Sequence, residues 1–359
     1  MIPYIIIFIG YMYYVILDKM KPNRVYLFSF SFIVIIISGL RWRTGTDWLP
    51  YEMYFHNLNP SNVDDYSHIE YGYRIFMLSI KNIFSNYSFF LFFQSLIVIG
   101  LKVLVSLKMN NIQRILFCTI YLLAYCFNIF NVRQDISISL ILVAIVFYNQ
   151  GLLKFTLITL LASLFHKSAI ICLLFPFIYL LNKRNLLFFT VLISIIFISF
   201  IKIDIGAWLP DSISYKYYSF VYEAPESYTK SLLGQIMSFL TKFPYVIFLY
   251  YSFLKLDLSK NERYITAIAL LGFILSIISI SSGIGMLNRI AIYFYITELY
   301  IIPILLVKYS YLASKKNSLL LLGMFLVIYL GRFYSYINSY SDLFIPFESI
   351  LEINFKDVY

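Results

Sequence analysis

Charged residues are scarce in this sequence: 13% of its 359 residues are charged, whereas 61% are hydrophobic. Soluble globular domains carry about 25% charged residues. A chain with so few charges and a mean hydropathy of +0.81 has too little polar surface to cover a water-soluble particle. Collagenous and disordered classes are excluded by the same composition. The sequence therefore predicts an all-α, polytopic integral membrane protein with no soluble domain.

Cysteine is also rare, and the motifs of common cofactor sites are missing. The three cysteines, Cys118, Cys126 and Cys172, stand inside apolar runs without paired spacing, which excludes a disulfide framework and a zinc site and leaves them as small core residues. There is no Walker A, GxGxxG, HExxH, GxSxG or DxD motif. The sequence therefore predicts neither a nucleotide substrate nor a metal or other cofactor.

Long apolar runs dominate what remains. A helix needs about 20 apolar residues, and at least about 17, to cross a bilayer. We expect about 12 transmembrane helices, of which 152–165 and 168–181 are short enough to form one re-entrant hairpin instead. The runs are 2–17, 25–40, 87–107, 115–130, 136–149, 152–165, 168–181, 186–201, 234–254, 264–281, 290–307 and 318–336.

The distribution of charge predicts the sidedness of these spans. No basic residue precedes the first run, so we expect a retained span that starts outside, not a signal peptide. The segments that then face inward hold 15 basic and three acidic residues, as the positive-inside rule requires. They are 18–24, 102–114, 150–154, 182–184, 255–263 and 308–316. The formal charge of +10 thus reflects membrane orientation and not nucleic-acid binding, and both termini are expected outside.

One membrane domain, 1–359, accounts for the whole chain, with long outer loops at 41–86 and 202–233. The short stretch 131–135 and the tail 337–359 also face outward in this topology. Within the first loop, Tyr71–Phe84 is apolar at helical spacing and predicts a helix lying in the membrane interface.

Basic residues on the outer side break the positive-inside pattern. Arg41 and Arg43 directly follow the second span, and Thr44-Gly45-Thr46 allows a turn that brings Asp47 back toward them. They are either headgroup anchors or, because a planar guanidinium matches phosphate oxygens bidentately, ligands for an anion. Arg133 starts the fifth span and either pairs within its loop with Asp135 or takes part in the same site.

His166, between the two short spans, is either a structural residue or a proton acceptor at the outer interface. Arg289 opens the eleventh span, and Arg332 lies near the outer end of the twelfth. Glu298 falls near mid-membrane, where an ionisable group marks either a functional site or a buried ion pair. Together these residues fit an anionic, partly lipidic ligand at the outer leaflet, such as a lipid-linked diphosphate.

Four landmarks then resemble the EpsG-type polysaccharide polymerases, which are similar to Wzy. Their order and spacing match over about 41–170, and Arg289 fits a later landmark more loosely. The landmarks are Gly39-Leu40-Arg41-Trp42-Arg43-Thr44-Gly45-Thr46-Asp47-Trp48 with Tyr51, Glu70-Tyr71-Gly72-Tyr73, Asn131-Val132-Arg133-Gln134, and Leu161-Ala162-Ser163-Leu164-Phe165-His166-Lys167-Ser168-Ala169.

The resemblance implies an O-antigen or capsule polymerase that joins undecaprenyl-diphosphate-linked oligosaccharide repeats at the periplasmic face of the bacterial plasma (inner) membrane. It also implies a flippase and a chain-length regulator as partners. An exporter of lipid-linked oligosaccharide, an O-antigen-ligase-like transferase and a structural membrane partner stay open as alternatives. We expect catalytic roles for Asp47, His166 and Arg133, and substrate binding by Arg41, Arg43, Arg289, Arg332, Tyr51 and Glu298.

Overall fold

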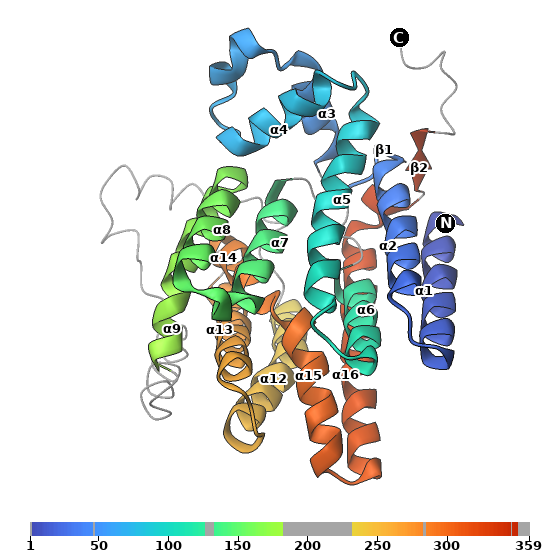
Figure 1. Ribbon diagram of the computed structural model, residues 1–359, viewed down its shortest axis with the longest axis vertical. Coiled ribbons are helices and arrows are strands. Elements are labelled where there is room, and N and C mark those ends of the chain that lie inside the picture. The colour runs from blue at the N-terminus through green and yellow to red at the C-terminus, as the bar shows by residue number, and fades with distance from the viewer. Residues whose placement is uncertain are drawn as a thin grey trace. The chain divides into compact units, whose positions relative to one another are not determined.

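The computed structural model describes residues 2–45, 47–125, 133–181, 232–282, 285–345 and 347–350. The chain forms two compact units. Unit 1 comprises Met1–Phe147, Leu153–Ile170 and Lys315–Tyr359, and unit 2 comprises Tyr148–Leu152 and Ile171–Ser314. The described residues are overwhelmingly helical (Figure 1), which confirms a helical membrane protein.

The elements follow in chain order. Unit 1 contains α1 (Ile2–Met20), α2 (Arg24–Gly39), β1 (Arg41–Trp42), α3 (Trp48–Asn57), the 3-10 helix η1 (Pro60–Tyr66), α4 (Tyr71–Lys81), α5 (Tyr87–Ser106), α6 (Asn111–Tyr125), α7 (Arg133–Val146), α8 (Leu152–Phe165), α16 (Lys315–Phe344) and β2 (Glu348–Ser349). Unit 2 contains η3 (Tyr148–Gln150), α9 (Phe175–Leu181), α12 (Leu232–Lys255), α13 (Lys260–Ser282), α14 (Gly285–Tyr295) and α15 (Glu298–Leu312). The 3-10 helix η4 (Lys167–Leu174) crosses the boundary between the two units.

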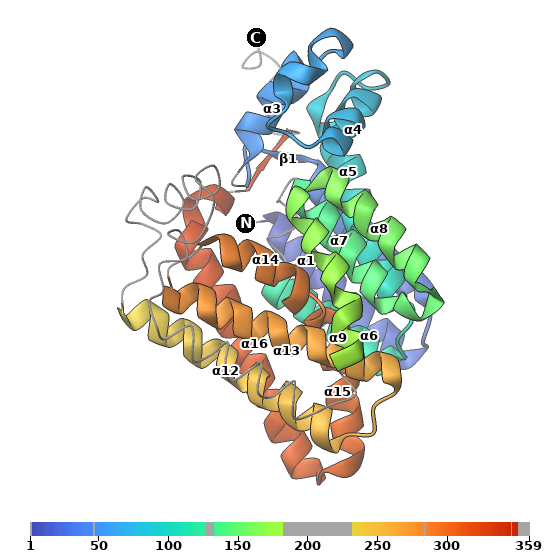
Figure 2. The same ribbon diagram turned by 90° about the vertical axis from the view of Figure 1, so that its left-hand side faces the viewer.

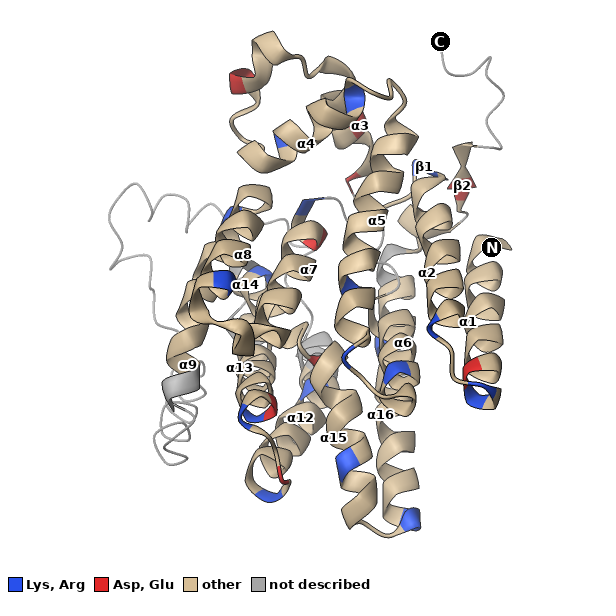
Figure 3. Cartoon of the chain, viewed as in Figure 1, with Lys and Arg blue, Asp and Glu red and all other residues tan. Residues whose placement is uncertain are grey.

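Helices α1 and α2 form an antiparallel pair whose apolar lengths carry no charge, with the charges gathered where the two helices are joined (Figure 3). Asn23 begins α2 by accepting a hydrogen bond from the Val25 N–H, which satisfies a backbone donor that the helix leaves open. At the other end of α2, a Cβ on Gly39 would lie 2.8 Å from the Phe92 Cα. Gly39 therefore lets α2 approach α5 closely, just before Arg41.

The first outer loop is a folded element in its own right. Helices α3 and α4 pack where α5 begins (Figures 1 and 2). Their core is aromatic, with Trp48, Phe55, Tyr73 and Phe90 all at most 2% exposed. Burying each such ring stabilises the loop by about 1.5–3 kcal/mol. The expected helix at Tyr71–Phe84 is confirmed as α4, which ends at Lys81.

A second set of contacts lies at the same end of unit 1. Strand β1 pairs antiparallel with β2, with Arg41 opposite Ser349 and Trp42 opposite Glu348. The Tyr4 hydroxyl donates to the Phe344 carbonyl at 2.7 Å. The start of α1, the end of α2 and the end of α16 therefore lie at the same end of the unit.

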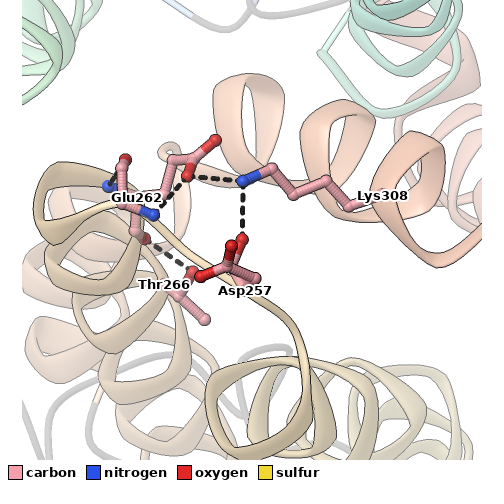
Figure 4. A network of polar contacts seen from close by, with 5 residues as sticks. Asp257, Glu262, Thr266 and Lys308 are labelled. Carbon is pink, nitrogen blue, oxygen red and sulfur yellow. Dashed lines mark hydrogen bonds and ion pairs between the residues drawn. The ribbon is translucent and has the colours of Figure 1, made fainter. Parts of the chain in front are cut away.

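In unit 2, helices α12, α13 and α14 pack in sequence. A Cβ on Gly272 of α13 would lie 2.7 Å from the Phe294 carbonyl carbon, so Gly272 allows close approach at the end of α14. Elsewhere in the unit, the Lys308 Nζ donates to the Asp257 carbonyl and the Glu262 Oε2, both at 2.8 Å (Figure 4). Residues 255–263 and 308, both predicted to face inward, thus lie together.

The structure supports several membrane spans but does not confirm the predicted number of about 12. Four described helices are long and apolar enough to cross a membrane, or five if a bent pair counts as one span. That pair corrects the run 290–307: α14 and α15 meet at a 44° bend just before Glu298. The run 168–181 is also not one α-helix, because η4 occupies its first half and α9 its second. The predicted span 186–201 and nearly all of the outer loop 202–233 lie outside the described residues.

Candidate functional site

The predicted residues that the structure brings together lie around the carboxylate of Glu70, at the end of unit 1 that the sequence predicts to face outward. Glu70 directly precedes α4 and is 8% exposed. Its Oε2 accepts a hydrogen bond from the Arg133 Nη1 at 2.5 Å, and its Oε1 accepts one from the Lys167 N–H at 3.3 Å. One carboxylate therefore links the start of α4, the start of α7 and the segment that follows α8.

The local sequence explains why Glu70 can reach these partners. A Cβ on Gly72 would lie 2.8 Å from both the Cβ and the carbonyl oxygen of Leu164. Only glycine allows the first turn of α4 to rest directly on the end of α8. That contact places Glu70 beside the Lys167 N–H.

Arg133 is the basic residue that this junction presents. Its side chain is 28% exposed, and its Nη1 also donates to the His68 carbonyl at 3.4 Å. The guanidinium carbon lies 5.8 Å from the centre of the Tyr51 ring, a favourable cation–π position. Tyr51 itself is buried, and burial raises the pKa of its hydroxyl. Arg133 is thus held by a carboxylate, a carbonyl and an aromatic face while part of it remains accessible.

His166 follows α8 and directly precedes Lys167. It is half-buried, and its Nδ1 lies 2.6 Å from the Ser168 Oγ in a hydrogen bond. Because the next residue donates its N–H to Glu70, the backbone of His166 is tied to the Glu70 junction. The structure therefore brings Arg133, His166 and Tyr51 into one region of unit 1.

Arg41 lies inside unit 1 and not on its surface. It is fully buried, and its Nη1 donates to the Ser38 Oγ at 3.5 Å, which in turn is 2.6 Å from the Ser95 Oγ. Burial lowers the pKa of Arg41 to about 10, against the opposing effects of Tyr87, Tyr73 and Asp135. The guanidinium therefore keeps its positive charge at neutral pH.

Arg43 and Asp47 are both exposed, on either side of the predicted turn. The backbone of Arg43 is in the left-handed region at φ 45°, which turns the chain there, and Gly45 follows at φ 112°. The Asp47 side chain does not cap α3. In the described part of the chain no ion pair joins Asp47 to an arginine, so the turn does not bring the carboxylate to a guanidinium as expected.

Asp135 corrects the pairing that was the alternative interpretation of Arg133. It lies in the first turn of α7, is 1% exposed, and pairs with the Lys102 Nζ at 3.7 Å inside unit 1. Residues two apart on a helix face different directions, so Arg133 and Asp135 cannot share a partner easily. Lys102 is likewise not a loop residue, because it is 2% exposed within α5.

The remaining predicted residues lie on other elements. Arg332 is well inside α16, not near its end, and its guanidinium lies over the rings of Tyr125 and Tyr329 at 5.5 and 5.6 Å. Arg289 is exposed on α14 of unit 2. Glu298 is fully buried in the first turn of α15, at the bend and not in the middle of a continuous span.

Sequence reasoning missed two features. Glu70 belonged to a recognised landmark but was not assigned to the site. Lys102 was counted among loop charges, although a lysine inside the apolar run of 87–107 is itself a signal of a buried partner.

These observations define a helical membrane protein in which a partly exposed arginine, Arg133, is held at one end of unit 1. The sequence model of the EpsG family matches residues 23–349. The chain therefore belongs to the EpsG family, a Wzy-like polymerase-type family, as its landmarks indicated. This membership indicates a polymerase or glycosyltransferase type of function. No curated protein and no solved structure matches the chain.

Proposed function

We propose that the chain is a membrane glycosyltransferase that polymerises undecaprenyl-diphosphate-linked oligosaccharide repeats into O-antigen or capsular polysaccharide. It does so at the outer, periplasmic face of the bacterial plasma membrane, with both termini on that side. The observation that carries the proposal is the partly exposed Arg133, fixed by Glu70 beside His166 in a chain of the EpsG family. A flippase and a chain-length regulator are its proposed protein partners.

The reaction requires charge stabilisation and one proton transfer. A hydroxyl of the acceptor repeat attacks the anomeric carbon of the donor glycan, and a new glycosidic C–O bond forms. The bond from that carbon to the diphosphate oxygen breaks, and the lipid diphosphate leaves with the electron pair. The proton of the acceptor hydroxyl passes to His166 or Asp47, the two candidate bases.

Arginine suits the leaving group. Negative charge grows on the diphosphate in the transition state, so a guanidinium placed there stabilises that state more than the bound substrate. Arg133 and the exposed Arg43 are the proposed direct contacts. Buried Arg41, just after α2, adds a fixed positive charge at the same end of unit 1. Tyr51 holds Arg133 in place, and Arg289, Arg332 and Glu298 stay proposed contacts for the rest of the substrate.

The test is glycan length in a host from which this gene is deleted and then restored. We expect single-repeat glycan in the deletion and a full ladder with the wild type. Arg133→Ala should lower the polymerisation rate about 10²–10³-fold, by analogy with the loss of one oxyanion donor. Arg24→Ala, an exposed arginine at the far end of α2, is the matched control. An unchanged ladder from both Arg133→Ala and Asp47→Ala, at normal protein levels, would refute the assignment.

One observation favours a second candidate, the export of lipid-linked oligosaccharide. Transporters bind substrate where helices are broken, and Glu298 is buried at the break between α14 and α15. An exporter would move labelled lipid-linked repeats across vesicle membranes without lengthening them. A ligase-like transferase differs again, since it would make no ladder from a single lipid-linked substrate.

A further inference from the structure

Three aromatic rings form a cluster beside Arg133 that the proposed chemistry does not use. The ring centres of Tyr54 and His68 are 5.2 Å apart, those of Tyr54 and Tyr66 are 5.8 Å apart, and those of Tyr66 and His68 are 6.1 Å apart. Tyr54 and Tyr66 are half-buried and His68 is exposed. We call these three residues the outer ring cluster.

The cluster is directly continuous with the guanidinium of Arg133. The His68 carbonyl accepts a hydrogen bond from the Arg133 Nη1 at 3.4 Å. On the other side, Arg133 lies over the Tyr51 ring, and that ring packs edge-on against Tyr54 with centres 5.8 Å apart. A ligand whose anionic group contacts Arg133 therefore has the outer ring cluster close by, next to the Tyr51 ring.

The composition of the cluster suits a sugar. The C–H groups on one face of a pyranose are weakly apolar and positively polarised, and they stack on the negative face of an aromatic ring. Tyrosine hydroxyls and imidazole nitrogens can also exchange hydrogen bonds with sugar hydroxyls. Partly exposed rings with polar edges are what such a ligand requires, whereas a lipid chain would require a fully apolar surface.

The three residues are also held rigidly enough to serve as a surface. Arg74 donates to the Val63 carbonyl and pairs with Asp64, which fastens η1 to α4. Lys81 donates to the carbonyls of His56 and Leu58 at 2.7 Å, which fastens α4 to the end of α3. The segments that carry Tyr54 and Tyr66 are therefore both tied to α4.

We propose that the outer ring cluster of Tyr54, Tyr66 and His68 is a carbohydrate subsite that binds the sugars next to the diphosphate held by Arg133. The inference rests on the proposed function and specifies which part of the substrate each group recognises. Arg133 contacts the diphosphate, and the outer ring cluster contacts the first sugars of the repeat.

The test separates the two contacts by binding, without requiring turnover. The purified full-length chain is titrated with two probes: undecaprenyl diphosphate that carries the oligosaccharide repeat isolated from the deletion host, and bare undecaprenyl diphosphate. The wild type should bind the glycosylated probe more tightly. Tyr54→Ala and His68→Ala should each lower the affinity for the glycosylated probe about 2- to 10-fold and leave the affinity for the bare probe unchanged. Arg133→Ala should lower the affinity for both probes.

Tyr54→Phe keeps the ring and should retain most of the preference for the glycosylated probe. Tyr311→Ala is the matched control, because Tyr311 is an 80% exposed tyrosine in unit 2. Unchanged affinity for the bare probe shows that a variant is folded, and the exposed His68 provides a second variant if Tyr54→Ala is unstable. The subsite is refuted if the wild type shows no preference, or if Tyr54→Ala and His68→Ala both retain it. Failure of the proposed function would appear separately, as a deletion host in which the wild type restores no ladder.

Discussion

At the scale of single residues, Glu70 has a role that its amide analogue cannot take over. Its two carboxylate oxygens serve two different donors, the Arg133 guanidinium and the Lys167 N–H. Glutamine has a single acceptor oxygen, so Glu70→Gln leaves one donor without its partner. We expect a loss of about 1–3 kcal/mol in the free energy of unfolding and a shortened glycan ladder. Thermal unfolding in detergent and glycan electrophoresis measure the two effects.

Glu52→Gln is the control for this prediction, because Glu52 is a half-buried carboxylate of the same loop. Burial raises the pKa of Glu52, and the positive charge of Arg43 opposes that rise. Glu70→Asp should partly restore the ladder, since it keeps two acceptor oxygens. A Glu70→Gln variant with the stability and glycan ladder of the wild type would contradict the proposed role of Glu70 in linking Arg133 and Lys167.

The Lys102–Asp135 pair gives a second prediction at this scale. Both side chains are almost fully buried in unit 1, and Lys102 also lies over the Tyr121 ring at 5.4 Å. Lys102→Met alone leaves a buried carboxylate without its cation and should destabilise the protein by about 3–5 kcal/mol. Lys102→Met with Asp135→Leu removes both charges and should recover most of that loss. A double variant no more stable than the single one would show that the pair is not the source of the effect.

At the scale of elements, Gly72 controls how α4 docks on the end of α8. A Cβ there would clash with both backbone and side-chain atoms of Leu164, and the backbone at the end of α8 cannot move away without a large cost in free energy. Gly72→Ala should therefore displace α4 from α8, separate Glu70 from the Lys167 N–H and shorten the ladder. Gly323→Ala in α16 is the control, because a Cβ at Gly323 meets nothing within 4 Å. Added protease cleavage in the first loop of Gly72→Ala, absent from Gly323→Ala, would report the displacement.

Elements that depend on apolar length were predictable, and elements that depend on distant contacts were not. Helices α1, α2, α5 and α8 agree with their predicted runs within a few residues, because each is a continuous apolar stretch with a clear end. The β1–β2 pairing joins residues 41–42 to 348–349, and nothing local in either dipeptide indicates it. The bend before Glu298 could not be predicted from hydropathy, because the apolar run continues across it.

The candidate site likewise has features that the local sequence indicates and features that depend on distant contacts. Arg133 and His166 could be singled out because a cation or imidazole at the end of an apolar run is chemically conspicuous, and Tyr51 because it belongs to the first landmark. The partner of Arg133 was not predictable, because Glu70 is 63 residues away in the chain and Asp135 only two. The close approach at Gly72 brings Glu70 to Arg133, while Asp135 is taken up inside unit 1 by Lys102.

At the scale of the whole molecule, charge decides orientation and contacts decide which segments share a side. In unit 1, β1 with β2 and Tyr4 with Phe344 bring three segments to one end. In unit 2, Lys308 of α15 binds Asp257 and Glu262, which lie in and after the connection between α12 and α13. These contacts agree with the predicted grouping of outer and inner segments, and labelling must determine which group faces the periplasm.

Single cysteines at exposed positions test that orientation. Asn57 ends α3 in the loop predicted to face outward, whereas Asn110, just before α6, and Lys316, at the start of α16, lie in segments predicted to face inward. Because basic residues are retained on the cytoplasmic side, we expect an impermeant maleimide to label Asn57→Cys when added to spheroplasts, and Asn110→Cys and Lys316→Cys only after lysis. A cysteine-free parent is the control. Labelling in the reverse order would place Arg133 in the cytoplasm, where it could not meet a substrate presented at the outer leaflet, and the proposed polymerase would fail with it.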